Sequence, residues 1–402
     1  MLRYLEAREK VIRAIAAQPT RPTTETVSLA ASLARVLAEE VAADRDYPPF
    51  HRSTRDGFAV RAADIAQVPA RLKRLGEIRA GEGYPGTVGP GECVQIMTGA
   101  PVPAGADAVV MIEHTELNGE QVVAKRSVAA GANVVPRGSE ARQGTRLLAA
   151  GTRIGYPEVS LLGQVGKAQV RVYRRPRVAV LSTGDEVVAI DARPGPHQIR
   201  NSNSYSMAAQ VTLSGGEPLL LGNAPDELPQ LERRIRRGLE EDLLVLTGGV
   251  SMGKYDLVEA VLRRLGAEFY FDAVAIRPGR PAVFAACRGK FVFGLPGNPV
   301  STMVTFELFV APAIALLGGA LVPRLQFLKA RLAAPVKQNT RLTMFLPARL
   351  EGESAEVSVR ALPWQGSGDV LALTQGNCFL VVPDNVSELP AGSWVDVLPR
   401  RG

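Results

Sequence analysis

The sequence has 402 residues, of which 46% are hydrophobic and 22% are charged, and its formal net charge is +7. This length and composition indicate a folded protein of several domains and exclude disordered and fibrous proteins. Because the basic residues are scattered and accompany no zinc-finger, basic-zipper or RNA-binding motif, the charge favours a small anionic ligand over a nucleic acid.

The N-terminal segment, up to about residue 47, is predicted to be helical. Apolar side chains recur at helical spacing, including those of Val27 to Val41, until Tyr47-Pro48-Pro49 interrupts the pattern. The proline pair therefore predicts a boundary, with residues 1–49 on its N-terminal side.

Residues 50–137 change to short apolar runs separated by Gly and Pro clusters, which is typical of a small β-rich domain. The next segment, 138–175, returns to a mixed pattern with a predicted helix at Tyr156 to Leu162. We expect 138–175 to pack with residues 1–49 as one discontinuous linker domain, into which the β-rich domain is inserted.

Residues 176–325 alternate between strand-like and helical runs, which predicts a mostly parallel sheet covered by helices on both faces. The predicted strands are Val178 to Leu181, Leu219 to Leu221, Leu243 to Leu246 and Phe291 to Gly294. The predicted helices are Ser204 to Leu213, Leu228 to Leu239, Leu257 to Leu265 and a segment from Pro299 onward.

Residues 326–402 return to short strands, which predicts a C-terminal β-domain. The expected fold class is therefore multidomain α/β plus β. It combines a central, mostly parallel α/β domain, a β-rich inserted domain, a discontinuous helical or mixed domain and a C-terminal domain resembling a β-barrel.

Two segments bear on where the protein resides. Charges run through Met1 to Ile15, unlike the uncharged core of a signal peptide. The run Leu308 to Val322 is too short for a membrane span and contains Pro312 and two glycines, so a buried helix is expected there. We expect a cytoplasmic protein with no membrane partner.

Ligands of an open α/β sheet bind beyond the carboxyl ends of its strands, so the loops after the predicted strands are expected to converge on one edge. The three informative loops are Ser182-Thr183-Gly184-Asp185-Glu186, Thr247-Gly248-Gly249-Val250-Ser251-Met252-Gly253 and Gly294-Leu295-Pro296-Gly297-Asn298-Pro299. The pair Gly248-Gly249 suits a phosphate-like anion because it leaves backbone N–H groups bare, although a tight turn without a ligand has the same pattern.

Three carboxylates, those of Asp185, Glu186 and Asp256, follow these glycines. An acid repels a phosphate unless a hard divalent cation stands between them, so at least one of the three is expected to hold Mg²⁺. The alternative is that each carboxylate only caps the N-terminus of a helix.

The segment Arg277-Pro278-Gly279-Arg280-Pro281 places two guanidinium groups around a stiff turn, which suits bidentate contact with an oxyanion. A rival motif is Gly248 to Lys254, which matches the G-x-x-x-x-G-K phosphate loop of nucleotide hydrolases. Tyr255 stands where that loop needs a Ser or Thr hydroxyl for Mg²⁺, so we treat the match as accidental.

Together these motifs resemble the molybdopterin molybdenumtransferase family, which includes the E domain of gephyrin. Within the α/β domain the resemblance rests on Thr183-Gly184-Asp185-Glu186, Gly248-Gly249-Val250-Ser251, Arg277-Pro278-Gly279-Arg280-Pro281 and Gly294-Leu295-Pro296-Gly297-Asn298-Pro299-Val300-Ser301. Outside it, the matching segments are Ser53-Thr54-Arg55-Asp56-Gly57-Phe58-Ala59, Met97-Thr98-Gly99-Ala100-Pro101 and Gln365-Gly366-Ser367. The motifs follow the family's order along nearly the whole chain.

The resemblance implies a homodimer of elongated, four-part subunits, with an active cleft formed by the α/β domain of one subunit and the β-rich domain of the other. It also implies the reaction. The family takes adenylylated molybdopterin and molybdate, cleaves the adenylate with Mg²⁺ or a similar divalent cation, releases AMP and leaves molybdenum on the pterin dithiolene. The molybdopterin adenylyltransferase is a candidate partner.

Site residues are carried over by their positions in the motifs. The resemblance implies catalytic roles for Asp56, Thr98, Glu186, Asp226 and Asp256, of which Glu186 and Asp256 would hold the metal. It implies substrate-binding roles for Thr183, Gly184, Asp185, Gly248, Gly249, Ser251, Arg277, Arg280, Pro296, Pro299 and Ser367. Ser367 would reach the site from the C-terminal domain.

The sequence departs from the family's pattern at four positions. Arg277 and Arg280 stand where lysines are common, which keeps the charge but changes hydration and geometry. Glu140 stands near a frequent aspartate, and Arg55 replaces an apolar residue. The alternative function is a non-catalytic anion-binding or scaffold protein on the same fold, and the sequence leaves open the metal and the choice between molybdate and tungstate.

Overall fold

The computed structural model describes residues 1–18, 22–79, 81–249, 257–321, 325–353 and 357–401. These residues divide into two compact units. Unit 1 comprises Met1–Ala38, Ala150–Val159 and Gln169–Gly402, and unit 2 comprises Glu39–Ala149 and Ser160–Ala168. The four expected domains are a finer division, and their boundaries stay a prediction.

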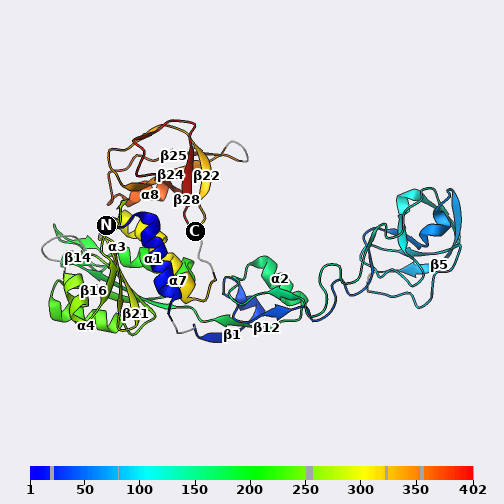
Figure 1. The fold of residues 1–402 in the computed structure, drawn as a ribbon, viewed down its shortest axis with the longest axis horizontal. Coiled ribbons are helices and arrows are strands. Elements are labelled where there is room, and N and C mark those ends of the chain that lie inside the picture. Colours follow the sequence, from blue (N-terminus) through cyan, green and yellow to red (C-terminus); the bar gives the residue numbers. More distant parts are fainter. Residues whose placement is uncertain (19–21, 80, 250–256, 322–324, 354–356, 402) are drawn as a thin grey trace. The chain divides into compact units, whose positions relative to one another are not determined.

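The central sheet belongs to unit 1 and has the strand order β16-β13-β17-β21-β20-β18. Figure 1 labels two of its strands, β16 and β21. Its strands are β13 (Arg177–Thr183), β16 (Glu217–Ala224), β17 (Leu243–Thr247), β18 (Glu268–Phe271), β20 (Val283–Cys287) and β21 (Lys290–Leu295). Strands β16, β13, β17 and β21 are parallel, whereas β20 and β18 extend the sheet with antiparallel pairings. The mostly parallel sheet and its four predicted strands are confirmed, and β18 and β20 are additions to the prediction.

Helices cover both faces of this sheet, as predicted. One hydrophobic core contains Val178 and Val180 of β13, and a second contains Ala179 and Leu181, so alternate side chains of one strand enter different cores. The first core packs against α1 (Tyr4–Ala16), α3 (Ser202–Leu213), α6 (Pro299–Thr305) and α7 (Ala311–Leu317), and the second against α4 (Leu228–Gly238) and α5 (Leu257–Arg264). Burial on both faces explains why β13 is a continuous apolar run.

The helical run Pro299–Leu317 consists of α6, a π-helical turn at Phe306–Val310 and α7. Its 19 residues and mean hydropathy of 1.9 are sufficient by length and composition for a membrane span, but 78% of its most apolar window is buried inside the protein. Figure 1 shows α1 beside α7. The predicted buried helix is confirmed up to Leu317, and Val322 lies outside the described residues.

The helix predicted over Val27 to Val41 is wrong. Residues Thr24–Ser28 form strand β1, which pairs antiparallel with β12 (Gln169–Tyr173), and only a 3-10 turn follows at Leu29–Ser32. The segment that contains β1 is rich in β-branched residues, which favour strands, and pairing with β12 supplies backbone hydrogen bonds. The helix predicted at Tyr156 to Leu162 is confirmed as α2 (Tyr156–Gln164).

Unit 2 is built on a six-stranded sheet with the order β7-β4-β6-β5-β9-β8, which confirms a β-rich fold within residues 50–137. Its strands are β4 (Gly57–Val60), β5 (Ala70–Ile78), β6 (Glu92–Ile96), β7 (Ala108–Met111), β8 (Thr115–Asn118) and β9 (Gln121–Ala124). Two short pairings accompany it: β3 (Arg52–Ser53) with β10 (Val134–Val135), and β2 (Val41–Ala42) with β11 (Arg146–Leu148).

The C-terminal strands close into a barrel. Pairings run from β24 through β25, β22, β28 and β26 and return to β24, and the short strand β19 (Ile276–Arg277) joins β24 in parallel. The barrel strands are β22 (Leu328–Leu332), β24 (Thr343–Glu351), β25 (Ser358–Ala361), β26 (Cys378–Val382) and β28 (Trp394–Pro399). Helix α8 (Val370–Gln375) and the pair β23 (Val336–Lys337) and β27 (Glu388–Leu389) complete this region. The predicted fold class is confirmed.

Candidate active site

Three of the predicted loops meet at one edge of the central sheet. Ser182 of β13 is paired with Thr247 of β17, and Thr247 is paired with Leu295 of β21, so the three strands end side by side. Thr183 is also paired with Ala224 at the end of β16, which brings Asp226 to the same edge. The expected convergence is therefore confirmed.

The glycine pair after β17 packs directly on Thr183. Gly248 and Gly249 have φ angles of 87° and 63°, in the left-handed region that favours glycine. A Cβ on Gly248 would lie 2.7 Å from the Thr183 carbonyl oxygen, and one on Gly249 would lie 2.8 Å from the Thr183 Oγ1. That Oγ1 is buried without a hydrogen-bond partner among the described residues, so a polar group is available beneath the loop.

The carboxylates after β13 and β16 lie close together. The Asp226 backbone N–H donates to the Asp185 Oδ1 at 3.0 Å. Burial raises the pKa of Asp226, and the negative charges of Asp185 and Glu186 raise it further. Gly184 leaves room for the Glu186 carboxylate, because a Cβ there would lie 2.4 Å from the Glu186 Oε2. Negative charge thus accumulates at this edge, as the sequence predicted.

Three asparagines hold these loops and were missed from the sequence. The Asn223 side chain donates to the carbonyls of Gly184 at 2.8 Å and of Val187 at 3.2 Å. These bonds fix both ends of the segment that contains Asp185 and Glu186. The Asn201 side chain donates to the Ser182 Oγ at 2.8 Å and also caps α3 by accepting from the Ser204 N–H. The available signal was its place three residues before the predicted start of a helix at Ser204, in a segment rich in Asn and Ser that favours N-caps.

The third asparagine, Asn203, joins the loops after β17 and β21. Its Nδ2 donates to the Gly297 carbonyl at 2.7 Å and to the Thr247 Oγ1 at 3.1 Å. Thr302 extends this network, since its Oγ1 donates to the Pro296 carbonyl at 2.5 Å. The loop before α6 is therefore held by side chains that no motif identified.

The two predicted arginines line one pocket with a volume of about 540 Å³. Of the other predicted substrate-binding residues, Pro296 and Ser367 line it as well, whereas Pro299 begins α6 and is not among its lining residues. The Val300 N–H donates to the Ser367 carbonyl at 2.9 Å, which ties the barrel region to α6. Asn298 and Ser301 of the predicted motif also line it, although neither was given a role, and Leu342 and Trp364 are lining residues outside every predicted motif.

Asp56 and Thr98 come together in unit 2. One carboxylate oxygen of Asp56 accepts both the Thr98 N–H at 2.6 Å and the Thr98 hydroxyl at 2.7 Å. These two hydrogen bonds hold the pKa of the exposed Asp56 below its ordinary value, the backbone bond contributing most. The buried Ser53 donates to the Arg55 carbonyl at 2.6 Å and so stabilises the turn that leads into Asp56.

Two further predicted residues, Ser251 and Asp256, lie outside the described residues, as does Lys254 of the rival motif. Among the described residues, no three His, Cys, Asp or Glu side chains are arranged to hold a metal ion. Glu140, one of the positions that depart from the family's pattern, forms an ion pair with Arg52 at 3.3 Å.

Three protein families match consecutive parts of the chain. Residues 2–166 match the MoeA N-terminal region (domain I and II), residues 179–316 match a probable molybdopterin binding domain, and residues 329–399 match the MoeA C-terminal region (domain IV). The three matches leave only short segments of the chain uncovered.

Curated relatives match over nearly their whole length. The molybdopterin molybdenumtransferase of Bacillus subtilis is 36% identical over 402 residues, which covers 98% of this chain and 94% of the relative. The protein of the same name from Nostoc sp. is 36% identical over 385 residues, covering 93% and 88%.

Solved structures share the whole architecture. One molybdopterin biosynthesis moeA protein from Pyrococcus horikoshii has a TM-score of 0.82 at 28% identity and covers 100% of both chains. A second structure of such a protein from the same organism has a TM-score of 0.76 at 33% identity and covers 98% of both chains.

Proposed function

The chain belongs to the molybdopterin molybdenumtransferase family, and from this membership we propose that it inserts molybdenum from molybdate into adenylylated molybdopterin and releases AMP. The observation that carries this function is the 36% identity to a transferase of that name over 98% of the chain. It is thus a transferase of molybdenum cofactor biosynthesis. The scaffold alternative is not favoured, because the curated relatives of matching length are named as transferases.

The oxyanions of the substrates bind in the pocket that Arg277 and Arg280 line. Both arginines line the same space of about 540 Å³, and residues 365–368 line it as well. Guanidinium forks bind oxyanions through paired N–H groups, which suits molybdate and the phosphates of the adenylylated pterin. Gly248 and Gly249 carry no Cβ, so the loop after β17 can pack directly on Thr183 beside this space.

The acidic edge is the proposed site of Mg²⁺ or a similar cation, with Glu186 and Asp256 as ligands. The donor chemistry fits, because carboxylate oxygens are the ligands that Mg²⁺ takes in proteins. The raised pKa of Asp226 beside Asp185 and Glu186 is a second support, since a cation would offset this repulsion. When bound, the cation would polarise phosphate oxygens.

We also propose that the chain works as a homodimer, in which Asp56 and Thr98 of one subunit act with the acidic edge of the other. The support is the family membership together with the fixed geometry of the Asp56–Thr98 pair. The molybdopterin adenylyltransferase is the proposed partner that delivers the substrate.

Assays of AMP release from adenylylated molybdopterin, with molybdate and Mg²⁺ present, test these roles. The variant Glu186→Gln keeps the side-chain size but loses the charge, and we expect kcat to fall about 100-fold or more. The matched control is Glu227→Gln, because Glu227 also lies next to Asp226 but outside the predicted site. Equal activity of the two variants would contradict the role of Glu186.

A further inference from the structure

A second pocket lies in unit 1, with none of its lining residues in the candidate active site. It has a volume of about 480 Å³, and its walls combine arginines with apolar side chains. The arginines are Arg153, Arg400 and Arg401, and the apolar residues include Leu213, Pro312, Leu325 and Leu398. A pocket of this composition matches a ligand with an anionic end and an apolar body.

Arg153 lines both this pocket and a smaller cavity beside it. Among the described residues, none places a carboxylate within 4.0 Å of its guanidinium. Burial lowers the pKa of Arg153, and the charges of Arg401 and Arg175 lower it further. The guanidinium lies near Gly215, at the C-terminal end of α3. Helix carbonyls attract a cation there, but they do not neutralise it.

Arg401 reaches the pocket from the C-terminal segment. Its guanidinium pairs with Glu307 at 3.4 Å and donates to the Ser214 hydroxyl at 3.2 Å. Arg400 instead donates to the Leu373 carbonyl at 2.6 Å. In the described part of the chain, Glu307 is thus the one acid paired with these arginines, and positive charge remains in excess.

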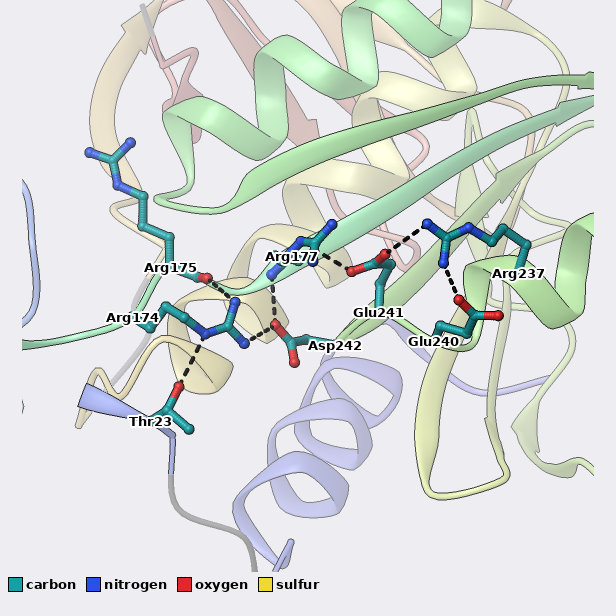
Figure 2. Close-up of polar contacts among 8 residues, drawn as sticks. All are labelled: Thr23, Arg174, Arg175, Arg177, Arg237, Glu240, Glu241 and Asp242. Carbon is teal, nitrogen blue, oxygen red and sulfur yellow. Dashed lines mark hydrogen bonds and ion pairs between the residues drawn. The ribbon is translucent and has the colours of Figure 1, made fainter. Parts of the chain in front are cut away.

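A narrow cavity lined by Arg153, Arg175 and Ser214 adjoins this pocket. Figure 2 shows how Arg175 differs from its neighbour Arg174. Arg174 turns toward Asp242 and pairs with it at 2.8 Å, whereas the Arg175 guanidinium points away from that network. Arg174 is therefore neutralised within the fold, and Arg175 adds to the charge around Arg153.

We propose that this pocket binds a small amphiphilic anion, whose oxyanion head contacts Arg153 and Arg401 and whose apolar body lies against the leucine and proline walls. Like charges held close together are stabilised when an anion bridges them. Guanidinium groups provide N–H donors for such a head group. Apolar walls contribute by removing the ligand's hydrocarbon from water.

Hexyl phosphate is the probe, and binding is measured by isothermal titration calorimetry in the Arg277→Ala/Arg280→Ala variant. This background removes anion binding at the candidate active site, and the readout is independent of catalysis. We expect hexyl phosphate to bind more tightly than inorganic phosphate, and hexanol to show no binding. Adding Arg153→Ala should weaken hexyl phosphate binding about tenfold or more.

Arg146→Ala is the matched control, because it removes one exposed arginine paired with Glu40 in unit 2 and should leave binding unchanged. Arg401→Ala would leave the buried Glu307 without this partner, so Arg401→Lys is used to keep the charge while losing the guanidinium fork. Circular dichroism checks that each variant is folded.

Two results would overturn the proposal. One is the absence of hexyl phosphate binding at millimolar concentration, and the other is equal affinity with and without Arg153. A change of oligomeric state in Arg153→Ala, without any loss of anion binding, would show instead that these arginines face a second copy of the chain.

Discussion

At the scale of single residues, Asp56 shows how a neighbouring loop sets the charge state of a carboxylate. Its pKa is lowered first by the Thr98 N–H and then by the Thr98 hydroxyl. A depressed pKa means that these bonds stabilise unit 2 above the pKa of Asp56 in the unfolded chain. This stability is lost as the pH falls through the lower, folded-state pKa.

Thr98→Val removes the hydroxyl donor and keeps the backbone N–H. We therefore expect the pKa of Asp56 to rise toward its ordinary value, without reaching it. A carbon-detected NMR titration of the Asp56 carboxyl group measures this directly. The control is Thr54→Val, which changes an exposed threonine in the turn that precedes Asp56. An unchanged pKa in Thr98→Val would show that the hydroxyl bond is absent in solution.

Asp226 presents the opposite case, because burial and the charges of Asp185 and Glu186 raise its pKa. An acid with a raised folded-state pKa lowers stability above that pKa and has no such effect below its unfolded-state pKa. Asp185→Asn removes one charge but keeps the oxygen that accepts the Asp226 N–H.

We therefore expect Asp185→Asn to raise the Tm at pH 7 without divalent cations by on the order of 1 °C, and to leave it unchanged at pH 3. Thermal unfolding followed by circular dichroism measures both values. Asp191→Asn, which removes an exposed acid, is the control. A lower Tm for Asp185→Asn at pH 7 would be inconsistent with repulsion at this edge.

At the scale of elements, the turn after β17 depends on Gly248. It has φ 87°, and a Cβ would lie 2.7 Å from the Thr183 carbonyl oxygen. Gly248→Ala should therefore lower the free energy of unfolding by roughly 1–3 kcal/mol and also reduce activity. Urea denaturation measures the stability change.

Gly266→Ala separates the two causes of this destabilisation. Gly266 has φ 80°, but a Cβ there would meet no atom within 4 Å. This variant carries the backbone strain without the steric contact, so it should lose less stability than Gly248→Ala. Equal losses would show that the contact with Thr183 contributes nothing.

The elements differ in how well the sequence predicted them. The parallel strands β13, β17 and β21 are buried on both faces and therefore appear in the sequence as short continuous apolar runs. Such runs are typical of buried strands, so these strands could be predicted. The segment Val27 to Val41 has apolar residues at helical spacing, yet its first two residues belong to β1, which pairs with β12, and Leu37 bridges to Val172 of the same distant strand. Antiparallel strands β18 and β20 carry no motif and were missed.

The candidate site shows the same division. Loops after strands were predictable because strand ends align in a parallel sheet. Asn203 and Asn223 were not, because each acts on carbonyl groups that only the folded chain brings near. Trp364 and Leu342 lie in the arginine pocket through contacts between the barrel and the central sheet, which local patterns do not encode.

At the scale of the whole molecule, the proposed sharing of the active cleft between subunits can be tested by mixing variants. Asp56→Ala and Glu186→Ala should each be inactive alone. If subunits exchange at random, half of the dimers in an equal mixture are mixed and each contains one intact cleft, so about a quarter of wild-type activity should return. Recovery is measured as AMP release after co-refolding, and no recovery would place both residues in the same subunit's cleft.

The proposed transfer of molybdenum to the pterin is tested most directly by one reaction in which two products are followed. Purified protein is incubated with adenylylated molybdopterin, Mg²⁺ and molybdate, and AMP release is followed together with activation of a cofactor-free molybdoenzyme. We predict AMP release that depends on molybdate, accompanied by activation of the molybdoenzyme. Folded protein that gives neither, with molybdate or with tungstate, would contradict the account.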